Sequence, residues 1–216
     1  MNSVVKQMFI VLIVVGGVSG LVLAGSYKLT KPRIERHKRE ELQKAIFEVL
    51  PEAKDCERNV DNDCKNIGTD QLLVYKGIGE QNTLAGYAFI AEGPGFQGTI
   101  RMIVGIDSDL DPLSGMRVLE QLETPGLGAK IAEDTAKEDF FEQFAGLHPD
   151  WTADDAIEES QATQISADFI TYVKNMTPDD PNEIQAITGA TISSKAVVAI
   201  INQSLAKLED QLNMQQ

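Results

Sequence analysis

An uncharged apolar run near the N-terminus constrains this chain more than any other feature. Residues 8–24 read MFIVLIVVGGVSGLVLA and contain no charged side chain. When the run is extended to Tyr27 it is about as long as a helix that spans the hydrocarbon core of a bilayer, roughly 20 residues. The sequence therefore predicts a transmembrane helix at residues 8–27, after a short N-terminal tail at residues 1–7.

A cleaved signal peptide is the alternative for the same residues. Val22, Leu23 and Ala24 fit a cleavage site, but the apolar run is long for a signal peptide. The first cysteine after the run is Cys56, so a lipoprotein anchor is not expected. We expect a single uncleaved anchor that contacts the lipid bilayer.

The charges beside the span and the two cysteines predict opposite orientations. Six cations lie between Lys28 and Arg39, and Lys6 is the only cation before them, so the positive-inside rule places the body in the cytoplasm. Cys56 and Cys64 lie eight residues apart in a polar stretch, and a disulfide between them requires an oxidising compartment. Two unpaired thiols are the alternative. The residues alone leave the side of the membrane open.

The body of the chain is acidic. The whole chain has 19 Lys and Arg residues, 33 Asp and Glu residues and a net charge of −14. Residues 40–216 contain 12 of the cations and 32 of the acids. Such a surface is not suited to a phosphate backbone, so we expect no nucleic-acid partner. It is either a solvated face or a docking face for a basic partner.

The polar residue types also exclude several kinds of site. Two cysteines and two histidines leave little room for a zinc or iron–sulfur site, which needs about four such ligands, so no metal is expected. The sequence contains no P-loop and no GxSxG motif. His37 and His148 have no evident catalytic partner and are interpreted as surface residues. We therefore expect no catalytic residues.

Hydrophobic periodicity predicts an α+β domain at residues 51–216, preceded by a juxtamembrane basic segment and helix at residues 28–50. The helical part, residues 33–50, ends at Pro51. Strands separated by Gly-rich or Asp-rich turns predict a mainly antiparallel sheet with flanking helices.

The expected strands are residues 72–76, 84–91, 99–106, 115–122 and 183–187. The expected helices are residues 132–144, with Phe140, Phe141 and Phe144 inward, and a last helix after Thr191, with Val197, Ile201, Leu205, Leu208 and Leu212 inward. Residues 150–163 are expected to form a loop or an edge strand.

One short motif lies where the fourth expected strand ends. It consists of Glu123, Thr124, Pro125, Gly126, Leu127 and Gly128. Pro125 fixes φ and Gly126 accepts a positive φ, as a type II turn requires. Exposed N–H groups in such a loop can bind an anion or the polar edge of a ring. Without other information, an ordinary tight turn is the simpler interpretation.

A second motif lies between the last expected strand and the last helix. It consists of Thr188, Gly189, Ala190, Thr191, Ile192, Ser193 and Ser194. Thr191 is at or next to the N-cap, and four hydroxyl groups surround the helix N-terminus, where N–H groups and the helix dipole stabilise a phosphate. The alternative is an ordinary capped helix.

Together, these two motifs resemble the signatures of bacterial FMN-binding domains. The sequence TGATISS is similar to the flavin-attachment sequence S/T-G-A-T-x-S/T of these domains, with Thr188 in place of the more common serine, and ETPGLG is similar to their other signature. The order of the motifs, the single N-terminal span and the chain length resemble the family of G subunits of Rnf electron-transport complexes. A similar domain occurs in the C subunits of sodium-translocating NADH:quinone oxidoreductases.

The resemblance implies a specific cofactor site. In the family, FMN is bound covalently by a phosphoester to the threonine at the position of Thr191, and a flavin transferase installs it from FAD. Thr188, Gly189, Ala190, Ile192 and Ser193 would surround the phosphate. Residues 123–128 would pack against the flavin ring. Gly189 and Ala190 leave the acceptor hydroxyl accessible.

The resemblance also implies a place and a role. The family works in the bacterial cytoplasmic membrane as a single-pass protein whose FMN domain lies on the periplasmic or extracellular side. That side agrees with a Cys56–Cys64 disulfide and disagrees with the cation count. The expected role is electron relay among the other subunits of an ion-translocating complex. The alternatives are a covalent-FMN subunit of a different extracytoplasmic reductase or quinone oxidoreductase complex, and a non-redox anchored binding module.

Overall fold

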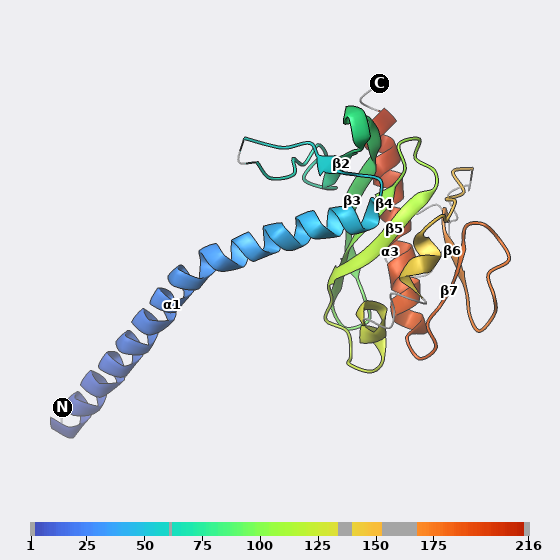
Figure 1. The fold of residues 1–216 in the computed structure, drawn as a ribbon. Helices are drawn as coiled ribbons and strands as arrows, with labels where there is room; N and C mark the ends of the chain where they lie inside the picture. Colours follow the sequence, from blue (N-terminus) through green and yellow to red (C-terminus); the bar gives the residue numbers. More distant parts are fainter. Residues whose placement is uncertain (1–2, 61, 134–139, 153–167, 214–216) are drawn as a thin grey trace. The chain divides into compact units, whose positions relative to one another are not determined.

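A computed structural model describes residues 3–60, 62–133, 140–152 and 168–213 (Figure 1). The chain divides into two units, Met1–Leu42 and Gln43–Gln216. The first unit contains most of a long helix, α1 (Ser3–Val49). The second unit contains the end of α1, all the described strands and the C-terminal helix α3 (Thr191–Asn213).

Helix α1 continues from the apolar run through the basic segment. Its most apolar 18 residues have a mean hydropathy of 2.5, and α1 is the one helix in the described residues that is long and apolar enough to cross a membrane. The prediction that the second helical segment begins at residue 33 is wrong, because residues 28–32 are helical too and Pro32 lies inside α1. Ion pairs at i,i+4 spacing, Lys31–Glu35 and Arg36–Glu40, support this exposed helix.

A five-stranded antiparallel sheet forms the centre of the second unit, and each strand pairs with the next along the chain. The prediction of a mainly antiparallel sheet is confirmed. The strands are β1 (Asp55–Cys56), β2 (Val74–Ile78), β3 (Leu84–Pro94), β4 (Thr99–Ile106) and β5 (Leu113–Glu120). The sequence does not predict strand β1, because two residues are too few to show alternation.

A smaller sheet joins β6 (Thr171–Val173) and β7 (Glu183–Gln185) in parallel. The sequence predicts strand β7 but not β6. Three short 3-10 helices complete the described elements: η1 (Glu80–Asn82), η2 (Gly128–Ala132) and η3 (Phe141–Phe144).

The expected helix at residues 132–144 is only partly tested. Its last four residues form a 3-10 helix rather than an α-helix, whereas residues 134–139 lie outside the described residues. The expected inward side chains are confirmed for Phe140 and Phe144, which are buried and pack edge to face. Residues 153–163 of the expected loop or edge strand also lie outside the described part of the chain.

The main hydrophobic core lies between the sheet and α3. Alternate residues of β4, including Met102 and Val104, are fully buried in it, together with Phe89 of β3. The predicted stripe of α3 is confirmed for Val197, Ile201, Leu205 and Leu208, which are all fully buried. Because Ile200 of α3 packs on Gly93, the helix is fixed close to the end of strand β3, beside the functional motifs.

On the opposite face of the sheet, glycines leave the space in which the end of α1 packs. A Cβ atom at Gly105 would overlap the carbonyl oxygen of Val49, and one at Gly77 would lie 2.7 Å from Leu50 Cδ1. The Ser114 hydroxyl donates to the carbonyl oxygen of Val49 at 2.6 Å. The last turn of α1 is therefore an integral part of the second unit.

Candidate functional site

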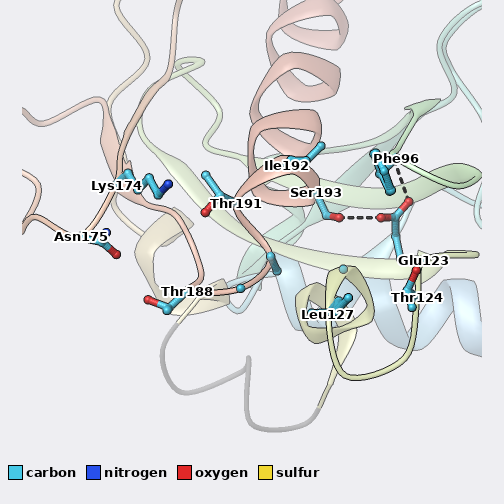
Figure 2. A pocket seen from close by; sticks show the side chains of 13 residues that line it. Phe96, Glu123, Thr124, Leu127, Lys174, Asn175, Thr188, Thr191, Ile192 and Ser193 are labelled. Carbon is cyan, nitrogen blue, oxygen red and sulfur yellow. Dashed lines mark hydrogen bonds between the residues drawn. The ribbon is translucent and has the colours of Figure 1, made fainter.

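The fold brings the two motifs together around one pocket of about 390 Å³ (Figure 2). The residues of the first motif come from the segment after β5, and those of the second lie at the start of α3. Ten of the predicted cofactor-site residues line the pocket: Glu123, Thr124, Leu127, Gly128, Thr188, Gly189, Ala190, Thr191, Ile192 and Ser193.

Pro125 and Gly126 do not line the pocket and instead shape its first loop. The Leu127 N–H donates to the Thr124 carbonyl oxygen at 3.1 Å, which closes a four-residue turn. Gly126 has a φ of +74°, the value that a type II turn requires at its third residue. This turn directs Leu127, whose side chain is 54% exposed, along the pocket wall.

The N-terminus of α3 lies at the pocket, and Ala190 precedes the first helical residue, Thr191. The Ser194 N–H donates to the Ala190 carbonyl oxygen at 2.9 Å and makes the first helical hydrogen bond. The preceding N–H groups, including those of Thr191 and Ile192, have no acceptor within the helix. They and the helix dipole favour a negative charge at this position.

The hydroxyl groups of the second motif differ in their surroundings. Ser194 Oγ donates to the Ala190 carbonyl oxygen at 3.0 Å and accepts from the Ile187 N–H at 3.1 Å. Ser193 Oγ is buried and donates to Glu123 Oε2 at 2.5 Å. The Thr191 hydroxyl is partly exposed and has no hydrogen-bond partner among the described residues. It is the accessible hydroxyl of the helix start.

Glu123 links both motifs to the turn between β3 and β4. Its side chain is 6% exposed, and its Oε1 accepts hydrogen bonds from the N–H groups of Phe96 at 2.9 Å and Gln97 at 3.0 Å. Burial acts to raise the pKa of Glu123, but the hydrogen bonds from Ser193 and from these N–H groups outweigh it and hold the pKa below its usual value. The carboxylate is therefore ionised at neutral pH.

We expect Glu123→Gln to lower the free energy of unfolding at pH 7 by about 1–3 kcal/mol, because an amide cannot accept all these hydrogen bonds. Because the pKa of Glu123 is lower in the folded state than in the unfolded chain, its ionised form stabilises the fold at pH values above the ordinary glutamate pKa, near 4.3. This stabilisation is lost as the pH falls through the lower, folded-state pKa. The difference between the variant and the original chain should therefore shrink below about pH 4.

Urea unfolding of both chains at pH 7 and at pH 3 measures this difference. Glu142→Gln is the matched control, because Glu142 is exposed and its change should stay within about 0.5 kcal/mol. A loss of stability in Glu123→Gln that is the same at both pH values would contradict the role given to the charge.

Three residues of the pocket are not expected from the sequence: Phe96, Lys174 and Asn175. Phe96 is 65% exposed and lies in the turn after β3. Lys174 follows β6, whose parallel pairing with β7 places it near the second motif. The GPGFQG sequence by itself indicates only a turn, and nothing local to Lys174 predicts its place in the pocket.

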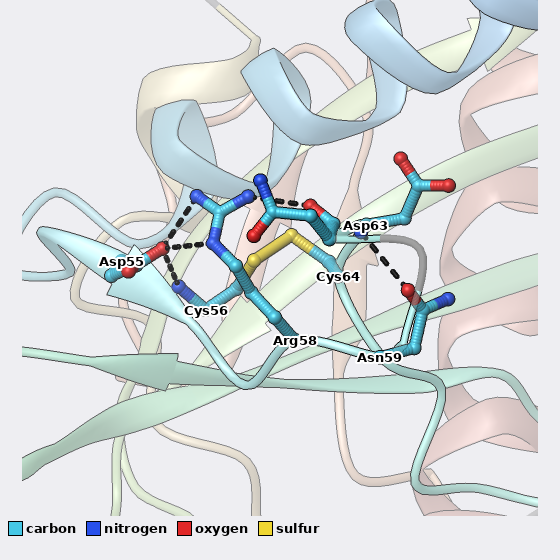
Figure 3. The surroundings of a disulfide bond; sticks show 7 residues. Asp55, Cys56, Arg58, Asn59, Asp63 and Cys64 are labelled. Atoms are coloured by element: carbon cyan, nitrogen blue, oxygen red, sulfur yellow. Dashed lines mark hydrogen bonds and ion pairs between the residues drawn. A yellow bond between two sulfur atoms is a disulfide. The ribbon is translucent and has the colours of Figure 1, made fainter.

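The predicted cysteine pair is joined in the structure by a disulfide, Cys56–Cys64 (Figure 3). It closes the loop that follows β1. Beside it, Arg58 donates to Asp55 Oδ1 at 2.7 and 3.0 Å, and these hydrogen bonds hold the pKa of the Asp55 carboxyl below its usual value. The predicted absence of a metal remains an expectation; among the described residues, no group of three potential ligand side chains was found.

Comparison with known proteins shows extended similarity. The FMN-binding domain family matches residues 95–206, which include both motifs. The G subunit of the Na(+)-translocating ferredoxin:NAD(+) oxidoreductase complex of Acetobacterium woodii is 33% identical over 94% of this chain and 91% of its own. The G subunit of the ion-translocating oxidoreductase complex of Methanosarcina acetivorans is 28% identical over 93% of each chain.

A solved structure shares the fold. NqrC of Shewanella oneidensis superposes with a TM-score of 0.57 at 15% identity, over 79% of this chain and 96% of that chain.

Proposed function

Since the chain belongs to the FMN-binding domain family and, within it, to the family of G subunits of ion-translocating oxidoreductase complexes, we propose that it relays electrons through FMN bound covalently to Thr191. The observation that carries the proposal is the position of the Thr191 hydroxyl. It has no partner in the described residues, lies at the N-terminus of a long helix and lines the pocket where both motifs meet.

The pocket fits such a cofactor in size and in chemistry. Its volume of about 390 Å³ lies within the usual range for small-ligand sites. Phe96, Leu127 and Ile192 offer exposed apolar surface for a planar ring. The helix N-terminus suits the phosphate, and Gly189, with a φ of +85°, adds no side chain of its own there, although Lys130 Nζ would lie 3.4 Å from a Cβ atom at this position.

Thr191 is the residue of the motif that is best placed to accept the flavin phosphate, because its hydroxyl is at the first residue of α3, whereas the exposed Thr188 lies three residues before the helix. In the proposed attachment, Thr191 Oγ bonds to the phosphorus of the FMN half of FAD, the pyrophosphate bond breaks, and AMP leaves. A flavin transferase catalyses this step. Ser193 and Ser194 are poor acceptors, because both hydroxyls are buried and engaged in hydrogen bonds.

When bound, FMN supplies the one-electron and two-electron redox chemistry, and the residues of this chain position and tune it. Glu123 fixes Ser193 and hence the first turn of α3 against the loop between β3 and β4. The apolar side chains of Phe96, Leu127 and Ile192 would shield one face of a bound ring from water. No acid–base catalytic residue is required for electron relay.

We propose that the partners are the other membrane and peripheral subunits of an ion-translocating ferredoxin:NAD oxidoreductase complex. A fluorescent flavin band that survives SDS, in a chain that copurifies with those subunits, tests this function. A flavin band without those subunits would instead favour a role in a different reductase. Absence of flavin in the chain purified from its native membrane would contradict both.

We also propose that residues 28–216 lie on the periplasmic or extracellular side of a bacterial cytoplasmic membrane, with residues 8–27 as the anchor. The disulfide supports this side, because such bonds persist in oxidising compartments. The cations between Lys28 and Arg39 oppose it. Partner subunits or the short N-terminal tail would then determine the insertion.

Cysteine labelling in intact cells tests this topology. We expect Glu142→Cys, at an exposed position of η3, to react with a membrane-impermeant thiol reagent before the cells are broken. Ser3→Cys, on the other side of the span, should react only afterwards. If Ser3→Cys reacts in intact cells and Glu142→Cys only in broken cells, the domain lies in the cytoplasm. The disulfide would then no longer support a periplasmic or extracellular location.

A further inference from the structure

Lys174 is a cation of the pocket that the two motifs do not explain. It lines the pocket together with Asn175, and its amine points toward Thr191 (Figure 2). The whole chain has a net charge of −14. No carboxylate among the described residues forms an ion pair with it.

The backbone accounts for the position of Lys174. Val173 is paired with Gln185 in the parallel β6–β7 sheet, and the Ala186 N–H donates to the Val173 carbonyl oxygen at 2.9 Å. The two strands therefore end at the same edge, where β7 leads to the Thr188–Thr191 turn and β6 leads to Lys174. Asn175 has a φ of 55°, so the chain turns sharply after Lys174.

Among the described residues, the charged groups near the pocket form no ion pair with Lys174. Glu123 already accepts hydrogen bonds from Ser193 and from two backbone N–H groups. Lys130 Nζ lies 3.5 Å from the Thr188 carbonyl oxygen and does not line the pocket. An anion between Lys174 and the N-terminus of α3 would form an ion pair with the Lys174 amine and accept hydrogen bonds from the free N–H groups of the helix.

We propose that Lys174 binds the phosphate of the flavin nucleotide and thereby selects a phosphorylated flavin for this pocket. The inference rests on the proposed function, because it assumes that the flavin phosphate is at Thr191. It adds a cationic subsite that lies outside both sequence motifs. The ring would then extend from this polar end of the pocket toward the apolar side chains of Phe96, Leu127 and Ile192.

Comparison of FMN with riboflavin isolates the phosphate. The full chain is produced without flavin transferase in detergent, and the dissociation constants of both flavins are measured by fluorescence titration. The original chain should bind FMN more tightly than riboflavin. Lys174→Gln should weaken FMN binding by about three- to fivefold, the usual effect of one partly exposed ion pair, and leave riboflavin binding unchanged.

Lys195→Gln is the matched control. Lys195 is an exposed lysine in the first turns of α3 that does not line the pocket, and its replacement should change neither constant. FMN binding that is unchanged in Lys174→Gln would overturn the inference, as would an equal loss for FMN and riboflavin. If the original chain binds neither flavin reversibly, the inference fails, whereas the proposed function is decided separately by the flavin band that survives SDS.

Discussion

Replacing Thr191 with alanine is expected to abolish covalent flavin while the domain stays folded. The variant loses the one accessible hydroxyl of the α3 N-terminus, and that hydroxyl makes no hydrogen bond within the described residues. We therefore expect the free energy of unfolding to change by no more than about 1 kcal/mol, the value of a modest capping effect. Flavin fluorescence in denaturing gels and urea unfolding measure the two quantities.

Two neighbouring variants serve as controls. Thr191→Ser keeps the nucleophilic oxygen and should retain part of the flavin. Ser193→Ala leaves the attachment oxygen in place but removes the hydrogen bond to Glu123. It should therefore lower the free energy of unfolding clearly and the flavin content only slightly. A denaturation-resistant flavin band in Thr191→Ala would refute the attachment site.

Replacing Gly128 with alanine is expected to disrupt the contact between the two motifs. A Cβ atom at this position would overlap Glu123 Oε2 and would lie 2.5 Å from Ser193 Oγ, and both groups are buried. The two side chains cannot separate without breaking their hydrogen bond. We expect a loss of about 1–3 kcal/mol in the free energy of unfolding and a shifted redox potential of the bound flavin.

Gly126→Ala is the matched control in the same loop. Nothing lies within 4 Å of its Cβ position, so only the positive φ opposes the substitution. Its effect on the flavin potential should be small, because Gly126 does not line the pocket. If Gly128→Ala and the original chain have the same free energy of unfolding and the same flavin redox potential, Gly128 is not part of the site.

The parts of the fold that can be predicted depend on local patterns. The sequence predicts strand β4 with the bounds that the structure shows, because its apolar residues are bounded by turn signals on both sides. It predicts the stripe of α3 because Val197, Ile201 and Leu205 recur at helical spacing. The ten pocket-lining residues of the two motifs are also predicted, because each motif is continuous along the chain and resembles a signature of FMN-binding domains.

The unpredicted features depend on contacts between distant residues. The parallel pairing of β6 with β7 involves three residues on each side, too few for a periodic signal, and it brings Lys174 to the same edge as the second motif. Similarly, the sequence does not reveal that Glu123 accepts from Ser193, 70 residues away. Pro32 lies inside the first helix, and the exposed ion pairs across it (Lys31–Glu35) and after it (Arg36–Glu40) fit a continuous helix.

The mass of the intact chain, followed by peptide mapping, tests the central claim most directly. Purified from its native membrane, the chain should have the mass of the uncleaved polypeptide plus one FMN, less one water for the phosphoester and less two hydrogens for the disulfide. The modified peptide should contain Thr191. An unmodified polypeptide mass, or a flavin on a peptide that lacks Thr191, would contradict covalent attachment at the start of α3.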